Sequence, residues 1–274
     1  MINDNKYKIL KEVQKNGISK CQEFLSKDNF ETIEKILVNN KSIKSSKSSF
    51  FYKSKEKFLL KKLSNFEFKN FLDCIKLIKL SKFLKLNELS SEIRGKQTKL
   101  TSIDSYFSPV SNNKVLDWHV DQAYSGNLEP EKFLNPDHCA IKYFIYLTDV
   151  SSGNGCLGYI PGSHKILYFL KLGIFNKQIK YKPYWKLSDL RKIVLDSYYR
   201  NYLETKIETE LIENFLEHTV FIGNKPHDTA KYDFVLKKSG TLIFDEAGVH
   251  RGAETLETNR LVIRFVYKNI HAPD

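Results

Sequence analysis

The spacing of apolar residues divides this chain into a helical first third and a later part rich in strands. Before residue 100, apolar positions recur at helical spacing, which is typical of helices that pack on one face. Ser26-Lys27-Asp28 caps the first predicted helix, whereas the Ser/Lys-rich segment 41–55 predicts a solvated connecting loop. The two apolar stripes consist of Phe30, Ile33, Ile36 and Leu37, and of Phe68, Phe71, Leu72, Ile75 and Ile78.

From about residue 100 onward, β-branched and aromatic residues gather in short runs bounded by turn residues. Residues 166–232 interrupt these runs as an insertion rich in Tyr, Lys and Leu, and its middle, Leu187 to Phe215, has a helical pattern. Helices followed by many short strands predict an α+β chain built on a closed or sandwiched β-core. The predicted strands are 101–107, 140–147, 233–236, 241–244 and 261–267.

Composition places the chain among globular proteins that bury a sizeable core. Of its 274 residues, 41% are hydrophobic and 13% aromatic. The formal net charge of +12 reflects 44 Lys and Arg against 32 Asp and Glu, but only six of the basic residues are Arg. Nucleic-acid readers rely on the planar Arg side chain, so the scattered lysines favour a solvated surface over a nucleic-acid site.

The four cysteines, at positions 21, 74, 139 and 156, show no C-x-x-C spacing, and no signal-peptide pattern precedes them. We therefore expect buried, reduced thiols in a cytoplasmic protein. No stretch approaches the roughly 18 apolar residues of a membrane span, so no membrane partner is expected.

The pattern that carries chemistry is His119-Val120-Asp121, with His250 far downstream. On a strand, residues two apart point to the same side, so His119 and Asp121 reach one metal while Val120 turns away. Two imidazoles and one carboxylate leave half of an octahedral coordination sphere open, as non-haem Fe(II) oxygenases require. The H-x-D triplet alone is common by chance, and its context must support it.

Several blocks surround these residues along the chain. They are Trp118-His119-Val120-Asp121, 143–150, Asn154-Gly155-Cys156-Leu157, 160–165, 240–244, His250-Arg251-Gly252 and 260–265. Together, and in matching order, these blocks resemble the phytanoyl-CoA dioxygenase family. The resemblance covers roughly residues 100–165 and 233–268, whereas the N-terminal part and the insertion match in position only.

The resemblance implies a double-stranded β-helix, a jelly-roll or cupin-like barrel, within a single domain spanning 1–274. Helices in 1–99 would buttress the barrel core of 100–165 and 233–268, and the insertion 166–232 would cover its mouth. The implied cofactors are Fe(II), 2-oxoglutarate and O2, with succinate and CO2 released while a C–H bond of a small molecule is hydroxylated. His119, Asp121 and His250 match the metal ligands, and the retained carboxylate argues against halogenation.

Four further residues are candidates for binding the cosubstrate. In this family a basic residue at the position of Arg260 holds the far carboxylate of 2-oxoglutarate, and a guanidinium suits that bidentate contact. Arg264 either binds the second carboxylate of 2-oxoglutarate or forms a salt bridge inside the barrel. Lys142, on an otherwise apolar strand, either meets an anion such as 2-oxoglutarate or extends to solvent. Tyr106 precedes the metal motif, and Ser108 stands where family members often have a lysine.

Other residues in and near these blocks are not predicted to bind the metal or the cosubstrate. His164 is expected to be structural and to fix the turn after a strand. Arg251 either contacts the substrate or lies on the protein surface. Trp118, Gln122 and Tyr124 flank the metal motif and are candidates for lining the substrate pocket.

Three alternatives to a small-molecule dioxygenase remain at this stage. The barrel could be a binding or sensor module without catalysis, an alkylated-nucleic-acid demethylase, or a cupin-type isomerase that works without O2. The intact triad together with Arg260 argues against the first. Known demethylases space two arginines further apart on the final strand than Arg260 and Arg264, so a small-molecule substrate without a nucleic-acid partner is favoured.

Overall fold

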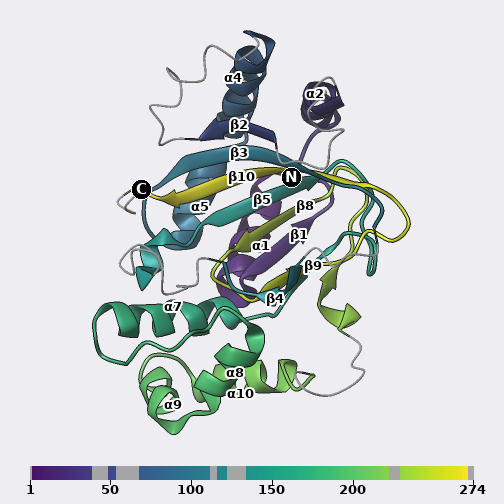
Figure 1. Ribbon diagram of the computed structural model, residues 1–274. Coiled ribbons are helices and arrows are strands. Elements are labelled where there is room, and N and C mark those ends of the chain that lie inside the picture. The colour runs from purple at the N-terminus through teal and green to yellow at the C-terminus, as the bar shows by residue number, and fades with distance from the viewer. Residues whose placement is uncertain are drawn as a thin grey trace.

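The computed structural model describes residues 2–38, 49–53, 68–111, 116–121, 134–221 and 229–270 (Figure 1). The strands are β1 (Ile18–Cys21), β2 (Ser49–Lys53), β3 (Thr98–Ser108), β4 (Leu116–His119), β5 (Ile141–Tyr146), β6 (Leu157–Tyr159), β7 (Asp233–Phe234), β8 (Thr241–Asp245), β9 (His250–Gly252) and β10 (Arg260–Asn269). They form two antiparallel sheets, a larger one ordered β1-β8-β5-β10-β3-β2 and a smaller one ordered β4-β9-β6-β7.

The central strand β5 shows how the sequence builds the larger sheet. It pairs with β8 on one side and β10 on the other. Because side chains alternate along a strand, Tyr143 and Ile145 are buried on the outer face. Phe144 and Tyr146 lie on the inner face, in the core shared with the smaller sheet, and Lys142 shares that inner face.

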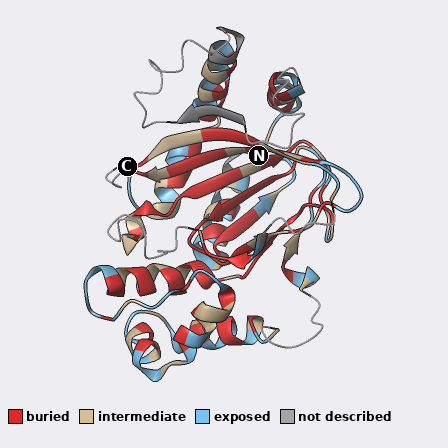
Figure 2. Ribbon diagram, viewed as in Figure 1, coloured by how far each residue is buried: buried red, intermediate tan, exposed pale blue. Residues whose placement is uncertain are grey.

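Helices cover the outer face of the larger sheet and bury a continuous apolar core against it (Figures 1 and 2). They are α1 (Ile2–Asn16), α2 (Lys27–Val38), α4 (Phe68–Phe83) and α5 (Leu86–Arg94). The Ile33 and Leu37 side chains of α2 and Leu86 of α5 are fully buried there. The predicted role of these helices as a buttress is therefore what the structure shows.

The inserted segment forms a second helical layer beside the smaller sheet, at the lower end of Figure 1. Its helices are α7 (Ser163–Phe175), α8 (Leu187–Leu195), α9 (Ser197–Glu204) and α10 (Thr209–His218). They share one apolar core with Trp118 and Val120, which flank His119, and with Val249, which precedes His250. Packing of the insertion is thus continuous with the segments that carry the metal motif. Two short 3-10 turns, η2 (Pro136–His138) and η3 (Ala230–Tyr232), complete the described elements.

Three expectations for the first hundred residues are corrected. The region 1–99 is not purely helical, because β1 and β2 add strands to the larger sheet. β2 lies within the predicted loop 41–55, whose residues 41–48 and 54–55 fall outside the described part, and its pairing with β3 supplies the order that local sequence does not. In the part of α4 whose side chains are described, the buried positions are Asp73, Leu77, Leu80 and Ser81. Of the expected stripe, Leu72 is 43% exposed and Ile75 and Ile78 are half-buried, whereas the side chains of Phe68 and Phe71 lie outside the described part.

The cysteines match the expected buried thiols in part. All four cysteines are free; Cys139 and Cys156 are buried, but Cys21 and Cys74 are only half-buried. Within the described residues, the helices are all too short or too polar to cross a bilayer. The predicted strand 233–236 is shorter than expected, since β7 contains only two residues.

Candidate active site

The two sheets bring the three predicted metal ligands together. His119 is the last residue of β4, Asp121 lies in the turn that follows, and His250 opens β9, where it pairs directly with His119. The two imidazole rings are 4.5 Å apart between centroids. One ligand atom from each of the three residues lies within 4.8 Å of the others. In the described part of the chain, this is the cluster of side chains suited to a metal ion.

Backbone carbonyls fix the tautomer of both histidines. Nδ1 of His119 is 2.7 Å from the carbonyl oxygen of Asp117, and Nδ1 of His250 is 2.8 Å from that of Gly248. Because a carbonyl can only accept, Nδ1 must carry the proton and donate it, which leaves Nε2 of each ring with a free lone pair. Each Nε2 is 3.5 Å from an oxygen of Asp121, so the lone pairs and the carboxylate face one common point.

The ring of Tyr159 sets the position of His250. It lies stacked on the imidazole, with centroids 6.5 Å apart and an interplanar angle of 16°. Its hydroxyl donates to the carbonyl of Asp245 at 2.9 Å and fills the space beside Gly17 and Gly248. A Cβ at Gly248 would overlap this hydroxyl, so only glycine allows the ring and the carbonyl of residue 248 to approach His250 together.

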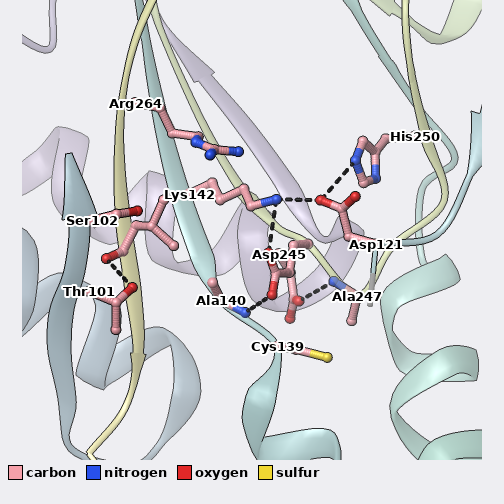
Figure 3. Close-up of polar contacts among 12 residues, drawn as sticks. Thr101, Ser102, Asp121, Cys139, Ala140, Lys142, Asp245, Ala247, His250 and Arg264 are labelled. Atoms are coloured by element: carbon pink, nitrogen blue, oxygen red, sulfur yellow. Dashed lines mark hydrogen bonds and ion pairs between the residues drawn. The ribbon is translucent and has the colours of Figure 1, made fainter. Parts of the chain in front are cut away.

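Lys142 meets protein carboxylates rather than solvent. Its Nζ contacts Asp121 (Figure 3) and lies 2.8 Å from Oε2 of Glu246. Burial would raise the pKa of Asp121, but the ammonium group of Lys142 holds that pKa well below its usual range. The pKa of Glu246 is likewise lowered, because Lys142 outweighs burial, and the pKa of Lys142 is raised by the two acids despite burial. The expected anion for Lys142 is therefore supplied by the protein, and an extension to solvent is excluded.

Arg260 is buried without a carboxylate partner among the described residues. It begins β10, as predicted, and donates to the carbonyl of Gly155 at 3.1 Å and to Oγ of Ser108 at 2.9 Å. Its Nε, and the hydroxyl of buried Tyr146, have no hydrogen-bond partner there. Gly155 permits this packing, since a Cβ would lie 2.9 Å from Cδ of Arg260. A buried guanidinium with spare donors is the group that a ligand carboxylate would satisfy.

Arg264 forms the salt bridge that was one of its two predicted roles. Its guanidinium donates to both carboxylate oxygens of Asp104, each at 2.9 Å, and Asp104 is fully buried. The same guanidinium lies over the Tyr106 ring, 4.8 Å from its centroid. Two of its donor nitrogens are therefore engaged within the barrel, and a cosubstrate contact for Arg264 stays a prediction. Tyr106 stays on the inner face of the larger sheet, and a cosubstrate contact for it remains a prediction.

Other residues of the motif blocks are placed as follows. Arg251 binds both oxygens of Asp233, at 2.8 and 3.0 Å, and lies over the Trp118 ring, so it ties β9 to β7. His164 is buried against α1, as expected of a structural residue. Gln122 and Tyr124 lie outside the described residues.

Glu246 is the site residue that sequence reasoning missed. The sequence did contain a signal, because Glu246 directly follows a buried strand and stands four residues before His250. Acidic residues at the end of a buried strand need a partner, which an unexplained strand lysine such as Lys142 could have provided.

The donor set fits a ferrous ion and a dicarboxylate cosubstrate. Two neutral imidazoles and one ionised carboxylate converge with ligand atoms on one side, and they match the facial ligand set of non-haem iron. Arg260, held on the larger sheet, offers unmatched positive charge on the inner face of the fold. The residues needed to hold both groups are therefore present.

Comparison with known proteins identifies the family. The model of the phytanoyl-CoA dioxygenase family (PhyH) matches residues 13–192, more than half of the chain. The chain belongs to this family. The family, the enzyme class of Fe(II)/2-oxoglutarate-dependent oxygenases, and the cofactors Fe(II), 2-oxoglutarate and O2 that were expected from sequence are thereby confirmed.

Solved structures share the fold at low sequence identity. EctD from S. alaskensis, in its apo form, has a TM-score of 0.53 and 14% identity over 95% of this chain and 75% of its own. The epimerase SnoN, in complex with Fe3+, alpha ketoglutarate and nogalamycin RO, has a TM-score of 0.51 and 11% identity over 97% of this chain and 84% of its own. The predicted jelly-roll architecture is confirmed by this likeness.

A third structure, EvdMO1, has a TM-score of 0.50 and 14% identity over 97% of this chain. The chain spans half the length of EvdMO1, so the two proteins share one part of the larger molecule. No curated protein matches the chain at a significant level.

Proposed function

We propose that this protein oxidises an unactivated C–H bond of a small molecule, by hydroxylation or a related outcome, with Fe(II) held by His119, Asp121 and His250. The observation that carries the proposal is the convergence of the three ligand atoms, with both histidine tautomers set by backbone carbonyls. When bound, Fe(II) and 2-oxoglutarate supply the activation of O2, with release of succinate and CO2.

The chain's own residues bind and orient in this proposal. Arg260 would hold the distal carboxylate of 2-oxoglutarate, because its guanidinium is buried and lacks a carboxylate partner among the described residues. Ser108 and the carbonyl of Gly155 fix the guanidinium plane. The apolar side chains around Phe144 and Phe244 exclude water from the inner face of the larger sheet.

We further propose that the chain acts as one catalytic domain in which the insertion 166–232 covers the mouth of the barrel. Support comes from the segment before α8. The amide of Val120 donates to the carbonyl of Trp185 at 3.0 Å, and Lys186 pairs across a β-bridge with His119. Trp185 is 53% exposed at this rim, so it is available to a small-molecule substrate. SnoN, which shares the fold, was solved with the small molecule nogalamycin RO.

An anaerobic titration tests the metal and cosubstrate assignment. Fe(II) added with 2-oxoglutarate should give the weak visible charge-transfer band of the iron–keto acid chelate, and His119→Ala should abolish it. His218→Ala, which changes a histidine on α10, is the matched control and should retain the band. An undiminished band in His119→Ala would show that the metal binds elsewhere.

Admission of O2 then separates an enzyme from a binding module. An oxygenase should convert 2-oxoglutarate to succinate slowly even without substrate, whereas a pure binder should produce none. An O2-uptake screen of metabolite pools, with Fe(II) and 2-oxoglutarate supplied, would then identify the substrate class.

A further inference from the structure

Lys142 and Glu246 form a buried ion pair that reaches the carboxylate of Asp121; we call it the Lys142–Glu246 bracket. Nζ of Lys142 contacts Oδ2 of Asp121 (Figure 3) and lies 2.8 Å from Oε2 of Glu246. Lys142 is 5% exposed and Glu246 is 2% exposed. Charges buried this deeply are costly unless they are paired, so the bracket is a built feature of the inner face.

Glu246 is held rigidly by the backbone at the start of β5. Its Oε1 accepts from the amide of Ala140 at 2.8 Å, and its own amide donates to the carbonyl of Ala140 at 3.0 Å. Lys142 is two residues further along the same strand. The bracket therefore connects Asp121, which lies in a turn after β4, to the rigid centre of the larger sheet.

We propose that Lys142 is a positioning residue for the metal: by donating to Oδ2, it leaves Oδ1 as the single oxygen that Asp121 offers to the ion. This proposal rests on the proposed function. Each carboxylate oxygen lies 3.5 Å from one Nε2, Oδ1 from that of His119 and Oδ2 from that of His250, so the contact with Lys142 is what distinguishes the two oxygens. Ligation through one oxygen keeps coordination positions open for a keto acid that binds through two atoms and for O2.

The bracket orients the carboxylate without changing the net charge of the site, because its ammonium and its carboxylate cancel. The effect of orienting the Asp121 carboxylate can therefore be measured separately from the Coulomb attraction between carboxylates and the metal ion. Lys142→Met leaves two carboxylates near the metal, and Coulomb attraction alone would tighten binding of a divalent cation. Loss of orientation predicts the opposite, a weaker affinity. Because the single variant removes the ammonium beside the buried Glu246 carboxylate, the double variant Lys142→Met/Glu246→Gln is used to remove the bracket at constant net charge.

The test is an anaerobic titration with Co(II) as the probe, followed by its visible absorption, with thermal unfolding of each metal-free protein measured in parallel. We expect the double variant to bind Co(II) about 10–100-fold more weakly than the wild type, the effect seen when partners of metal ligands are removed. We also expect a changed band intensity, because a carboxylate released from Lys142 can ligate through both oxygens and alter the coordination number.

The matched control is Arg264→Met/Asp104→Asn, which removes another buried ion pair on the inner face of the same sheet without touching a metal ligand. It should lower the unfolding temperature but keep the Co(II) affinity and spectrum. If the Lys142–Glu246 bracket only stabilised the fold, the Lys142→Met/Glu246→Gln protein would also unfold at a lower temperature while it kept the wild-type Co(II) affinity and spectrum.

Each result decides one question. If the wild type does not bind Co(II) and His119→Ala behaves identically, the proposed function itself is wrong. If the wild type binds Co(II) and the double variant binds it equally tightly with the same spectrum, the positioning role is overturned while the proposed function stands. Should the double variant not fold, Lys142→Met alone decides, because tighter Co(II) binding by it would also overturn the role.

Discussion

At the scale of single residues, the missing side chain of Gly248 decides the direction of His250. Its carbonyl accepts the Nδ1 proton of His250 at 2.8 Å, while the hydroxyl of Tyr159 occupies the space where a Cβ would be. Tyr159 in turn donates to the carbonyl of Asp245 and stacks on the imidazole. One glycine thus sets both the tautomer and the tilt of a metal ligand.

We expect Gly248→Ala to destabilise the protein by about 1–3 kcal/mol, because the added methyl group overpacks a site filled by Tyr159. Co(II) affinity should fall as well, since the imidazole must move with the displaced ring. Urea unfolding and Co(II) titration measure the two effects. Tyr159→Phe is the control: it removes only the hydrogen bond to Asp245, about 1 kcal/mol, and should leave the affinity nearly intact. Wild-type stability and affinity in Gly248→Ala would contradict this view of the packing.

Residue types and spacing predicted part of the site, and contacts between distant segments supplied the rest. His119, Asp121 and His250 could be predicted because the ligand chemistry is specific and the surrounding blocks resemble a family. The anion beside Lys142 could not, since it is Glu246, about one hundred positions away, brought close by the pairing of β5 with β8. For Arg264 the sequence left two partners open, and the structure shows one of them, the fully buried Asp104.

At the scale of elements, the inserted helices and the metal motif share one hydrophobic core. Leu190 of α8 is fully buried in the cluster that also contains Trp118 and Val120, on either side of His119. Backbone contacts from Trp185 and Lys186 add to this packing. The insertion is therefore a structural support of the site as well as its proposed cover.

Leu190→Ala should reduce the free energy of unfolding by about 2–5 kcal/mol, the usual effect of a cavity in a closed core. The Fe(II)–2-oxoglutarate band should weaken too, because Trp118 and Val120 lose packing next to a ligand. Leu195→Ala, on the same helix but at a side chain 54% exposed, should change the stability by less than about 0.5 kcal/mol. Equal stability of the two variants would show that α8 does not support the site.

The elements that sequence predicted well are those with long apolar runs, such as β5 and β10. The short strands β1 and β2 were missed because four or five residues carry too little pattern, and pairing with β8 and β3 decides their conformation. In α4, Asp73 is buried and Leu72 is exposed, the reverse of the expected pattern at these two positions. Local periodicity cannot anticipate which face of a helix other elements will cover.

At the scale of the whole molecule, His164 joins the N-terminal helix to the insertion. It stands at the start of α7, is 7% exposed, and its Nε2 is 3.4 Å from the carbonyl oxygen of Gln14 on α1. Burial lowers the pKa of His164 from 6.5 to about 4. The folded protein therefore keeps this imidazole neutral at a pH where the unfolded chain takes up a proton.

Stability should consequently fall as the pH drops from about 6.5 toward 4. Above 6.5 the contribution of His164 is fully present, and by pH 5 the loss attributable to it is about 2 kcal/mol. Urea unfolding at pH 7 and pH 5 measures this loss in the wild type and in His164→Gln. The variant, whatever its absolute stability, should lose about 2 kcal/mol less over the same interval. Parallel losses in both proteins would show that His164 titrates normally.

The two sheets divide the proposed site between them, and this division has a mechanical consequence. The three metal ligands belong to the smaller sheet and its turn, whereas Arg260 begins a strand of the larger one. Any molecule that contacts both the ion and the guanidinium therefore bridges the two sheets. Loading should therefore slow amide exchange in β4, β9 and β10 together, so that both halves of the sandwich resist opening as a single unit.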